Sequence, residues 1–231
     1  MKRVETTLKN QTETQTKSPW LPYVLPFVVF IGLTAPSSYY PGTTHLLYTA
    51  KTIIAASLLW FWRHHYKPEM APKLKPAGYL AAAAAGLMIL PVWILPGAIL
   101  PQIGEGTGFN PYSFGCPPAV VPALITVRLA GAVLVVPVME ELFWRSFLLR
   151  YLVHPDFKQV APGTFTWFSF VAVMVLFGLE HHRWIQGMIA GAVYAALLIQ
   201  QKSLRGCIIA HAVTNLGLGI YVIATQQWMF W

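Results

Sequence analysis

Apolar stretches separated by short polar or glycine- and proline-rich segments run through most of the sequence. Several of these stretches approach or exceed the roughly 20 residues that a helix needs to cross a membrane. We expect seven spans, over residues 20–35, 45–62, 77–100, 119–153, 164–179, 184–199 and 206–224. The pattern predicts an all-α fold, a polytopic transmembrane helical bundle of about seven to eight membrane helices, in which residues 19–231 form a single transmembrane domain.

The composition supports a membrane protein and excludes other classes. Apolar residues make up 56% of the 231 residues and charged residues only 10%, whereas an average soluble domain carries about 25% charged residues. These charges are too few to cover a soluble globule, and the chain is too apolar to be disordered. The only cysteines, Cys116 and Cys207, exclude a disulfide scaffold. Membrane lipid is therefore an expected partner.

The net charge of +8 is compatible with nucleic-acid binding, but the positions of the basic residues favour a membrane explanation. Lys and Arg occur in residues 1–18, 63–76, 154–163 and 200–205, and are missing from residues 36–44 and 101–118. Because basic residues collect in cytoplasmic loops, we expect residues 1–18 to be a flexible cytoplasmic tail, and we expect no nucleic-acid partner. Arg183, which this topology places outside, is the exception. The small chain favours a prokaryotic cell membrane.

Two glutamates and an arginine stand out in the stretch 119–153, because ionisable groups inside a membrane are costly and usually face a polar interior. Glu141 and Arg145 are four residues apart, so they share a helix face and can pair. Glu140 is rotated by about 100° from Glu141 and is free to point elsewhere. One paired and one unpaired carboxylate suit acid–base chemistry. A cytoplasmic helix end with solvated charges fits the same residues equally well.

Histidines mark two further places in the apolar segments. His211 and Asn215 lie four residues apart within the seventh span, so both project from one helix face. Two donors aimed at one point are what stabilisation of an oxyanion requires. We interpret Glu180 and His182 as parts of a polar turn after the fifth span, and His181 as a candidate site residue.

Taken together, the three motifs resemble the pattern of the CPBP family of intramembrane proteases, which contains the type II CAAX prenyl endopeptidases. That pattern is Glu-Glu-x-x-x-Arg, then Phe-x-x-x-His, then His-x-x-x-Asn or Asp, on successive membrane helices. The matching residues here are Glu140, Glu141, Arg145, Phe177, His181, His211 and Asn215. The resemblance covers residues 119–225 and leaves the first three spans as generic membrane helices.

The resemblance implies a membrane-embedded, glutamate-dependent peptidase without a cofactor. Glu140 would activate a water with help from His181. The oxyanion hole would consist of His211 and Asn215, and the Glu141–Arg145 pair would orient the site. The implied partner is a membrane-anchored protein or peptide that is cut near its C-terminus. In the family's best-known case this substrate is a prenylated CAAX tail.

Such a site requires residues from different spans to converge. Simple topology puts His181 at the outer end of the fifth span, whereas His211 lies toward the inner side. We therefore expect either that the segment 164–183 is short and ends within the membrane, or that the span boundaries differ. His182 would replace His181 on a rotated helix, but the spacing from Phe177 favours His181.

Other functions remain open from the sequence. The protein could keep the fold and bind a peptide or partner without catalysis, as an immunity-type protein does. It could relay protons as a transporter through Glu140, Glu141 and His211, or hydrolyse peptides with zinc held by its histidines and glutamates. A membrane aspartyl dyad is excluded, because Asp156 is the single aspartate, and the sequence has no His-Glu-x-x-His zinc motif.

Overall fold

The computed structural model of the chain describes residues 19–71, 73–95, 99–104 and 108–231, and the regular elements within them are all helical. The α-helices are α2 (Leu21–Gly32), α3 (Ala35–Tyr39), α4 (Thr44–Phe61), α5 (Lys67–Met70), α6 (Pro76–Ile94), α7 (Val121–Ala130), α8 (Val136–Glu141), α9 (Leu149–Tyr151), α10 (Trp167–Leu179), α11 (Trp184–Gln201) and α12 (Leu204–Thr225). The predicted all-α class is confirmed. The tail predicted at residues 1–18 lies outside the described residues.

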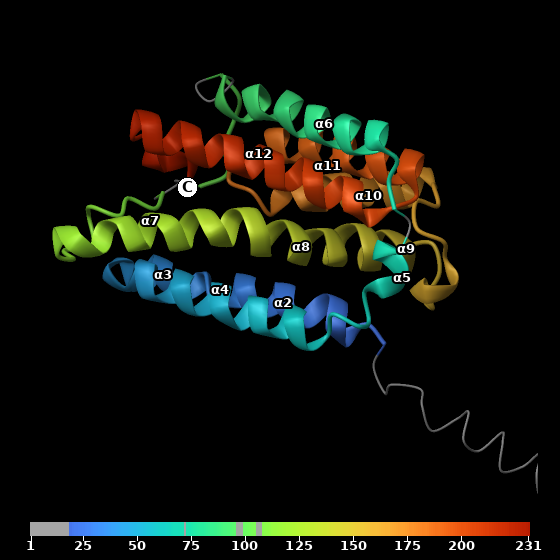
Figure 1. Ribbon diagram of the computed structural model, residues 1–231, viewed down its shortest axis with the longest axis horizontal. Coiled ribbons are helices and arrows are strands. Elements are labelled where there is room, and N and C mark those ends of the chain that lie inside the picture. Colours follow the sequence, from blue (N-terminus) through green and yellow to red (C-terminus); the bar gives the residue numbers. More distant parts are fainter. Residues whose placement is uncertain (1–18, 72, 96–98, 105–107) are drawn as a thin grey trace, which may run out of the picture.

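One helix of 34 residues, Pro118–Tyr151, runs through the middle of the bundle (Figure 1). It contains α7, α8 and α9 together with two π-helical segments, η3 (Gly131–Val135) and η4 (Leu142–Leu148). The prediction of one long helix over residues 119–153 is confirmed. Because η3 and η4 flank α8, the two glutamates at the end of α8 lie between π turns, which recur at functional sites in proteins.

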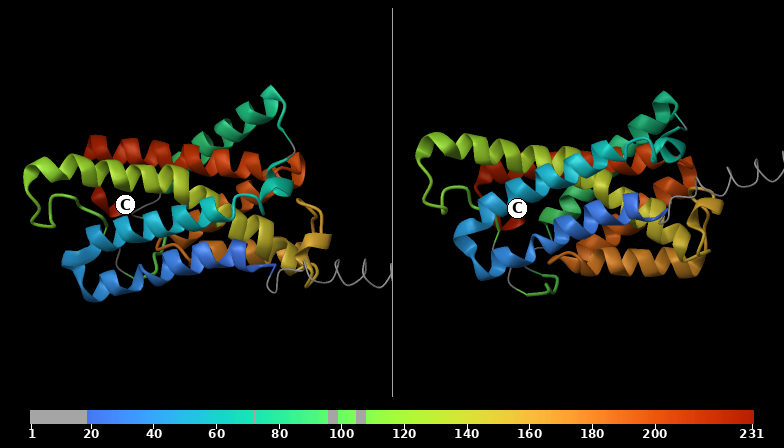
Figure 2. Two further views of the ribbon diagram at one scale, coloured as in Figure 1. Left: turned by 60° about the horizontal axis from the view of Figure 1, so that its bottom comes forward. Right: turned by 90° about the horizontal axis from the view of Figure 1, so that it is seen from below.

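The long helix separates two groups of helices (Figures 1 and 2). On one side α2 packs against α4, and both contact the long helix. On the other side α12 contacts the long helix at η3 and α8, while α6 packs on α12 and α10 packs on α11. This arrangement brings α8, the middle of α12 and the C-terminal end of α10 to one place.

Glycines allow the helices of the second group to approach one another closely. A Cβ atom added to Gly86 in α6 would overlap the backbone oxygen of Ala210 in α12. A Cβ atom added to Gly178 in α10 would lie 2.6 Å from the backbone oxygen of Trp184 in α11. Helices that cross at such short distances gain packing contacts without a hydrophobic driving force, as membrane helices must.

Three helices in the described part of the chain are long and apolar enough to cross a membrane, namely α6, Pro118–Tyr151 and α12. The predicted number of seven spans stays a prediction. Helix α10 is apolar but has only 13 residues, a length of about 20 Å, which is less than the ~30 Å of a hydrocarbon core. This agrees with the expectation that the segment 164–183 is short.

A buried polar cluster joins the start of the chain to the end of the long helix. Arg150 Nη2 lies 2.7 Å from Glu69 Oε1, and the Tyr23 hydroxyl donates to the same oxygen at 3.0 Å. Both charged side chains are 3% exposed. The cluster therefore ties α2, α5 and α9 together inside the protein.

Candidate active site

The charges of the first motif are buried within the bundle. Glu141 and Arg145 are each 0% exposed, and Glu140 is 6% exposed. Arg145 Nη1 donates to Glu141 Oε1 at 3.0 Å, and the guanidinium carbon lies 4.1 Å from the centroid of the Phe177 ring. The predicted pairing of Glu141 with Arg145 is confirmed, and the alternative of a solvated helix end is wrong.

His211 connects α12 to both glutamates. Its Nδ1 lies 2.9 Å from Glu141 Oε1, and its Nε2 lies 3.9 Å from Glu140 Oε2. An ionised carboxylate only accepts hydrogen bonds, so Nδ1 is the donor toward Glu141 and Nε2 is the nitrogen nearer Glu140. Tyr194 stacks on the imidazole with ring centroids 5.2 Å apart. The hydrogen bond to Glu141 therefore fixes the edge of the imidazole, and the stacked Tyr194 ring covers its face.

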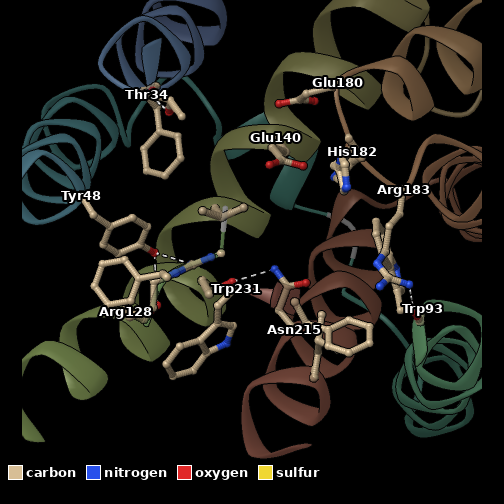
Figure 3. A pocket seen from close by; sticks show the side chains of 18 of the residues that line it. Thr34, Tyr48, Trp93, Arg128, Glu140, Glu180, His182, Arg183, Asn215 and Trp231 are labelled. Carbon is tan, nitrogen blue, oxygen red and sulfur yellow. Dashed lines mark hydrogen bonds between the residues drawn. The ribbon is translucent and has the colours of Figure 1, made fainter. Parts of the chain in front are cut away.

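Glu140 differs from Glu141 in its partners. Its Oε2 atom, like that of Glu141, is buried and has no hydrogen-bond partner among the described residues, although buried polar groups are nearly always bonded. Of the two glutamates, Glu140 lines the pocket and Glu141 does not. Figure 3 shows the carboxylate inside a pocket, with the Glu180 carboxylate also in view. A buried carboxylate oxygen with spare acceptor capacity beside a histidine nitrogen is suited to bind a water or a polar group of a substrate.

This pocket has a volume of about 660 Å³ and collects predicted residues from three separate segments. Glu140, His181, His211 and Asn215 all line it, whereas the Glu141–Arg145 pair does not line it and supports His211. Figure 3 shows Glu140 and Asn215 in this pocket. The volume falls in the range of sites that bind small organic ligands. Residues that are up to 75 positions apart in the sequence therefore share one cavity.

His181 lies just beyond the end of α10, between two aromatic rings. Its Nδ1 is 2.7 Å from the Phe177 backbone oxygen, so this nitrogen donates and Nε2 carries the lone pair. The rings of Phe177 and Trp93 have centroids 4.8 Å and 5.4 Å from that of the imidazole. His182 also lines the pocket, but its Nδ1 contacts the backbone oxygen of Ile103.

Asn215 is oriented by the backbone of the long helix. Its Nδ2 donates to the Ala132 oxygen at 2.8 Å, and Ala132 belongs to the π-helical segment η3. The amide nitrogen carries two N–H groups, so a second donor remains for a ligand. The π-helical segment η3 thus fixes the orientation of the Asn215 side chain through this hydrogen bond.

Sequence reasoning missed four charged residues that line the pocket, Lys51, Arg128, Glu180 and Arg183. Glu180 was assigned to a polar turn, yet its Oε2 accepts a hydrogen bond from Trp144 Nε1 at 2.9 Å and the side chain belongs to the pocket. Lys51 and Arg128 are cations inside apolar stretches, and the rule that flagged the acidic residues applies equally to cations.

Arg183 is the basic residue that did not fit the expected topology. It is 5% exposed, its Nη1 donates to the Trp93 oxygen at 3.3 Å, and its guanidinium carbon lies 4.3 Å from the centroid of the Phe230 ring. The contacts of Arg183 lie within the protein, whereas the topology rule concerns basic residues in solvent-exposed loops. Arg183 therefore does not contradict the distribution of basic loops.

Zinc held by histidines and glutamates is the alternative that the sequence left open. Within the described ranges, no group of three or more His, Cys, Asp or Glu side chains is placed to hold a metal ion. Glu141 is already bound to Arg145 and His211, and His181 Nδ1 is bound to a backbone oxygen. Glu140 Oε2 and the Nε2 atoms of His181 and His211 keep no hydrogen bond to the described residues, so the zinc alternative stays a prediction for experiment.

The structure is a helical bundle with helices long and apolar enough to cross a membrane, and its pocket contains buried carboxylates and histidines. Residues 122–217, which are 96 of the 231 residues, match the family model described as type II CAAX prenyl endopeptidase Rce1-like. The matched segment contains all three motifs, and the match confirms the resemblance that they indicated. The comparisons with curated proteins and with solved structures found no match.

Proposed function

We propose that this protein is an intramembrane endopeptidase that cuts a membrane-anchored protein or peptide near its C-terminus. The observation that carries the proposal is the buried, unpartnered Oε2 atom of Glu140, which lies 3.9 Å from His211 Nε2 in the pocket. The family match supports this class of substrate. A prenylated CAAX-type tail is the first substrate to test, in a prokaryotic cell membrane with the N-terminus of the protein cytoplasmic.

In the proposed reaction Glu140 removes a proton from a water, and the water oxygen attacks the carbonyl carbon of the scissile peptide bond. The Nε2 atom of His181 accepts a hydrogen bond from the second O–H of the water, since its Nδ1 donates to the Phe177 oxygen. A positioned general base typically contributes about 10²- to 10⁴-fold to the rate. Because water is the nucleophile, no Ser or Cys side chain is required.

Attack converts the carbonyl oxygen to an oxyanion, which needs donors already in place. The second N–H of Asn215 and Nε2 of His211, in its doubly protonated form, are the donors that support this step. When the carbon–nitrogen bond breaks, Glu140 passes its proton to the leaving amine. The products are one fragment with a new carboxylate and one with a new amine.

The Glu141–Arg145 pair has a positioning role in this mechanism. Glu141 binds His211 Nδ1 at 2.9 Å, and Arg145 neutralises the Glu141 charge at 3.0 Å. The imidazole is thereby held in a fixed orientation before substrate arrives. Orientation fixed in advance lowers the cost of stabilising charge in the transition state.

The test uses the full chain purified in detergent with prenylated and unprenylated membrane peptides. Wild type is compared with Glu140→Gln, with and without a strong zinc chelator. Asp156→Asn is the matched control, because it makes the same chemical change in an exposed loop. Cleavage that is lost in Glu140→Gln, unchanged in Asp156→Asn and insensitive to chelator supports the proposal.

Other outcomes of the same test contradict it. Cleavage abolished by the chelator would assign the residues to a metal mechanism. Normal cleavage by Glu140→Gln would remove the proposed base. Absence of cleavage with every peptide, by a folded wild-type protein, would favour a protein that binds a membrane peptide without cutting it.

A further inference from the structure

Two cations lie together in the pocket that holds Glu140. Lys51 of α4 and Arg128 of α7 both line this pocket, and Lys51 is only 8% exposed. Both lie close to the same ring, since Lys51 Nζ is 5.3 Å and the Arg128 guanidinium carbon 4.5 Å from the centroid of Tyr48. Figure 3 shows Arg128 and Tyr48 on one side of the cavity, with Glu140 across from them. We call Lys51 and Arg128 the cation pair.

Neither member of the cation pair lies within 4.0 Å of a carboxylate in the part of the chain that the structure describes, although Glu140 interacts with Lys51 across the pocket. Lys51 Nζ donates to Thr34 Oγ1 at 2.6 Å and lies 4.1 Å from the centroid of the Phe30 ring. Arg128 Nη1 donates to the Tyr48 hydroxyl at 3.0 Å, while its buried Nε has no hydrogen-bond partner. Hydroxyl groups and rings hold both side chains in place without neutralising them.

Such an arrangement is costly in the absence of an anion. A charge removed from water requires a counter-charge or a full set of hydrogen bonds, and two like charges beside one ring repel each other. A carboxylate offers two oxygens with four acceptor sites. It can therefore accept from the ammonium group and from the planar guanidinium together. A carboxylate bound between the two side chains would satisfy the unpaired Nε and offset both charges.

We propose that the cation pair binds the free carboxylate at the C-terminus of the substrate. This inference rests on the proposed function and names the substrate feature that sets the position of the cut. The cation pair and Glu140 share one pocket of about 660 Å³, a volume typical of small-molecule sites. Only a short segment of peptide fits between them, so the enzyme releases a short C-terminal fragment.

The test compares two membrane-anchored peptides that differ only at the C-terminus, which is a free carboxylate in one and a carboxamide in the other. The value of kcat/KM is measured for wild type, Lys51→Met, Lys51→Arg and Arg128→Lys. Arg63→Met is the matched control, because Arg63 is also a cation beside an aromatic ring, 4.5 Å from the centroid of Trp60, but lies exposed outside this pocket.

We expect wild type and Arg63→Met to prefer the carboxylate peptide by about tenfold or more, the usual value of a hydrogen bond to a charged group. In Lys51→Met this preference falls toward one, because the carboxylate peptide loses more of its kcat/KM than the carboxamide peptide does. Lys51→Arg and Arg128→Lys keep most of the preference, because each retains the charge. A purely structural role would slow both peptides equally.

Equal cleavage of the two peptides by wild type overturns the inference, as does an undiminished preference in Lys51→Met. If wild type cuts neither peptide, the proposed function fails by itself. Binding of the same peptides, carrying a fluorophore, to wild type and Lys51→Met then tests the cation pair separately, and equal affinities overturn it. Phosphatidylglycerol that binds in a Lys51-dependent manner without any carboxylate preference would assign a lipid phosphate instead and would also overturn it.

Discussion

Glu140 and Glu180 are two carboxylates in one pocket with different surroundings. Glu140 is 6% exposed and its Oε2 has no hydrogen-bond partner among the described residues. Glu180 is half-buried, and its Oε2 is occupied by the indole N–H of Trp144 at 2.9 Å. A general base needs a free lone pair directed at the reacting water, so Glu140 is better suited to this task.

A pair of amide substitutions separates the two carboxylates. We expect Glu140→Gln to lower kcat/KM by about 10²- to 10⁴-fold, the usual contribution of a general base. We expect Glu180→Gln to lower it by less than roughly tenfold, because the amide oxygen still accepts from Trp144. The measurement is peptide cleavage at matched concentrations of folded protein. The reverse order of effects would make Glu180 the base.

At the scale of elements, the short helix α10 depends on its contact with α11. A Cβ atom on Gly178 would lie 2.6 Å from the Trp184 backbone oxygen and would overlap the Met188 side chain. Gly178 comes three residues before His181, and the residue before it supplies the oxygen that holds His181 Nδ1. The packing of this glycine therefore sets the position of a pocket histidine.

Gly178→Ala tests this dependence. The added methyl group forces α10 and α11 apart, and we expect the free energy of unfolding in detergent to fall by about 1–3 kcal/mol, together with a loss of activity. Gly32→Ala serves as the control, because a Cβ atom there has nothing within 4 Å. An unchanged unfolding transition in Gly178→Ala would mean that the two helices can separate without cost.

The ion pair between Glu69 and Arg150 makes a second prediction at this scale. Glu69→Leu leaves the Arg150 charge buried without its partner, and we expect a loss of about 3–5 kcal/mol in the free energy of unfolding. The double variant Glu69→Leu with Arg150→Met should recover much of this loss, because no unpaired charge remains. Lys67→Met, at an exposed position of α5, should change stability by no more than about 0.5 kcal/mol.

Denaturant unfolding of the detergent-solubilised variants measures these differences. A double variant less stable than Glu69→Leu alone would show that Arg150 is stabilised chiefly by its other bonds. These other bonds join its guanidinium to the Ser146 hydroxyl and the Val160 oxygen. In that case the bonds of Arg150 to Ser146 and Val160 would contribute more to the free energy of unfolding than its ion pair with Glu69.

For the whole molecule, the distribution of basic segments predicts which face meets the cytoplasm. Residues 63–76 are basic, residues 36–44 contain no Lys or Arg, and α4 connects the two. The burial of Arg183 removes the only basic residue that opposed this orientation. We therefore expect the two ends of α4 to face opposite sides of the membrane.

Single exposed cysteines test this orientation in intact cells. In a Cys116→Ser background, Gly42→Cys should react with a membrane-impermeant maleimide, whereas Lys73→Cys should react only after the membrane is opened. Both positions are exposed, and the remaining Cys207 is buried. Labelling of Lys73→Cys but not of Gly42→Cys in intact cells would invert the topology and place the basic segments outside.

The sequence by itself determined the helical class, the long central helix and the seven residues of the three motifs. Long apolar stretches reveal membrane helices because a backbone in lipid must satisfy its own hydrogen bonds. The pairing of Glu141 with Arg145 was predictable because residues four apart on a helix are neighbours. These features depend only on positions close together in the chain.

The tertiary structure alone decided what the pocket contains beyond those motifs. Glu180 was assigned to a turn, and Lys51 and Arg128 drew no attention, yet all three line the pocket with Glu140. Which residues of different helices share a cavity depends on how far each helix extends, how it is rotated and how closely it packs, as at Gly178 and in the π turn of η3. No local pattern of spacing specifies these quantities, because they arise from contacts between helices distant in the sequence.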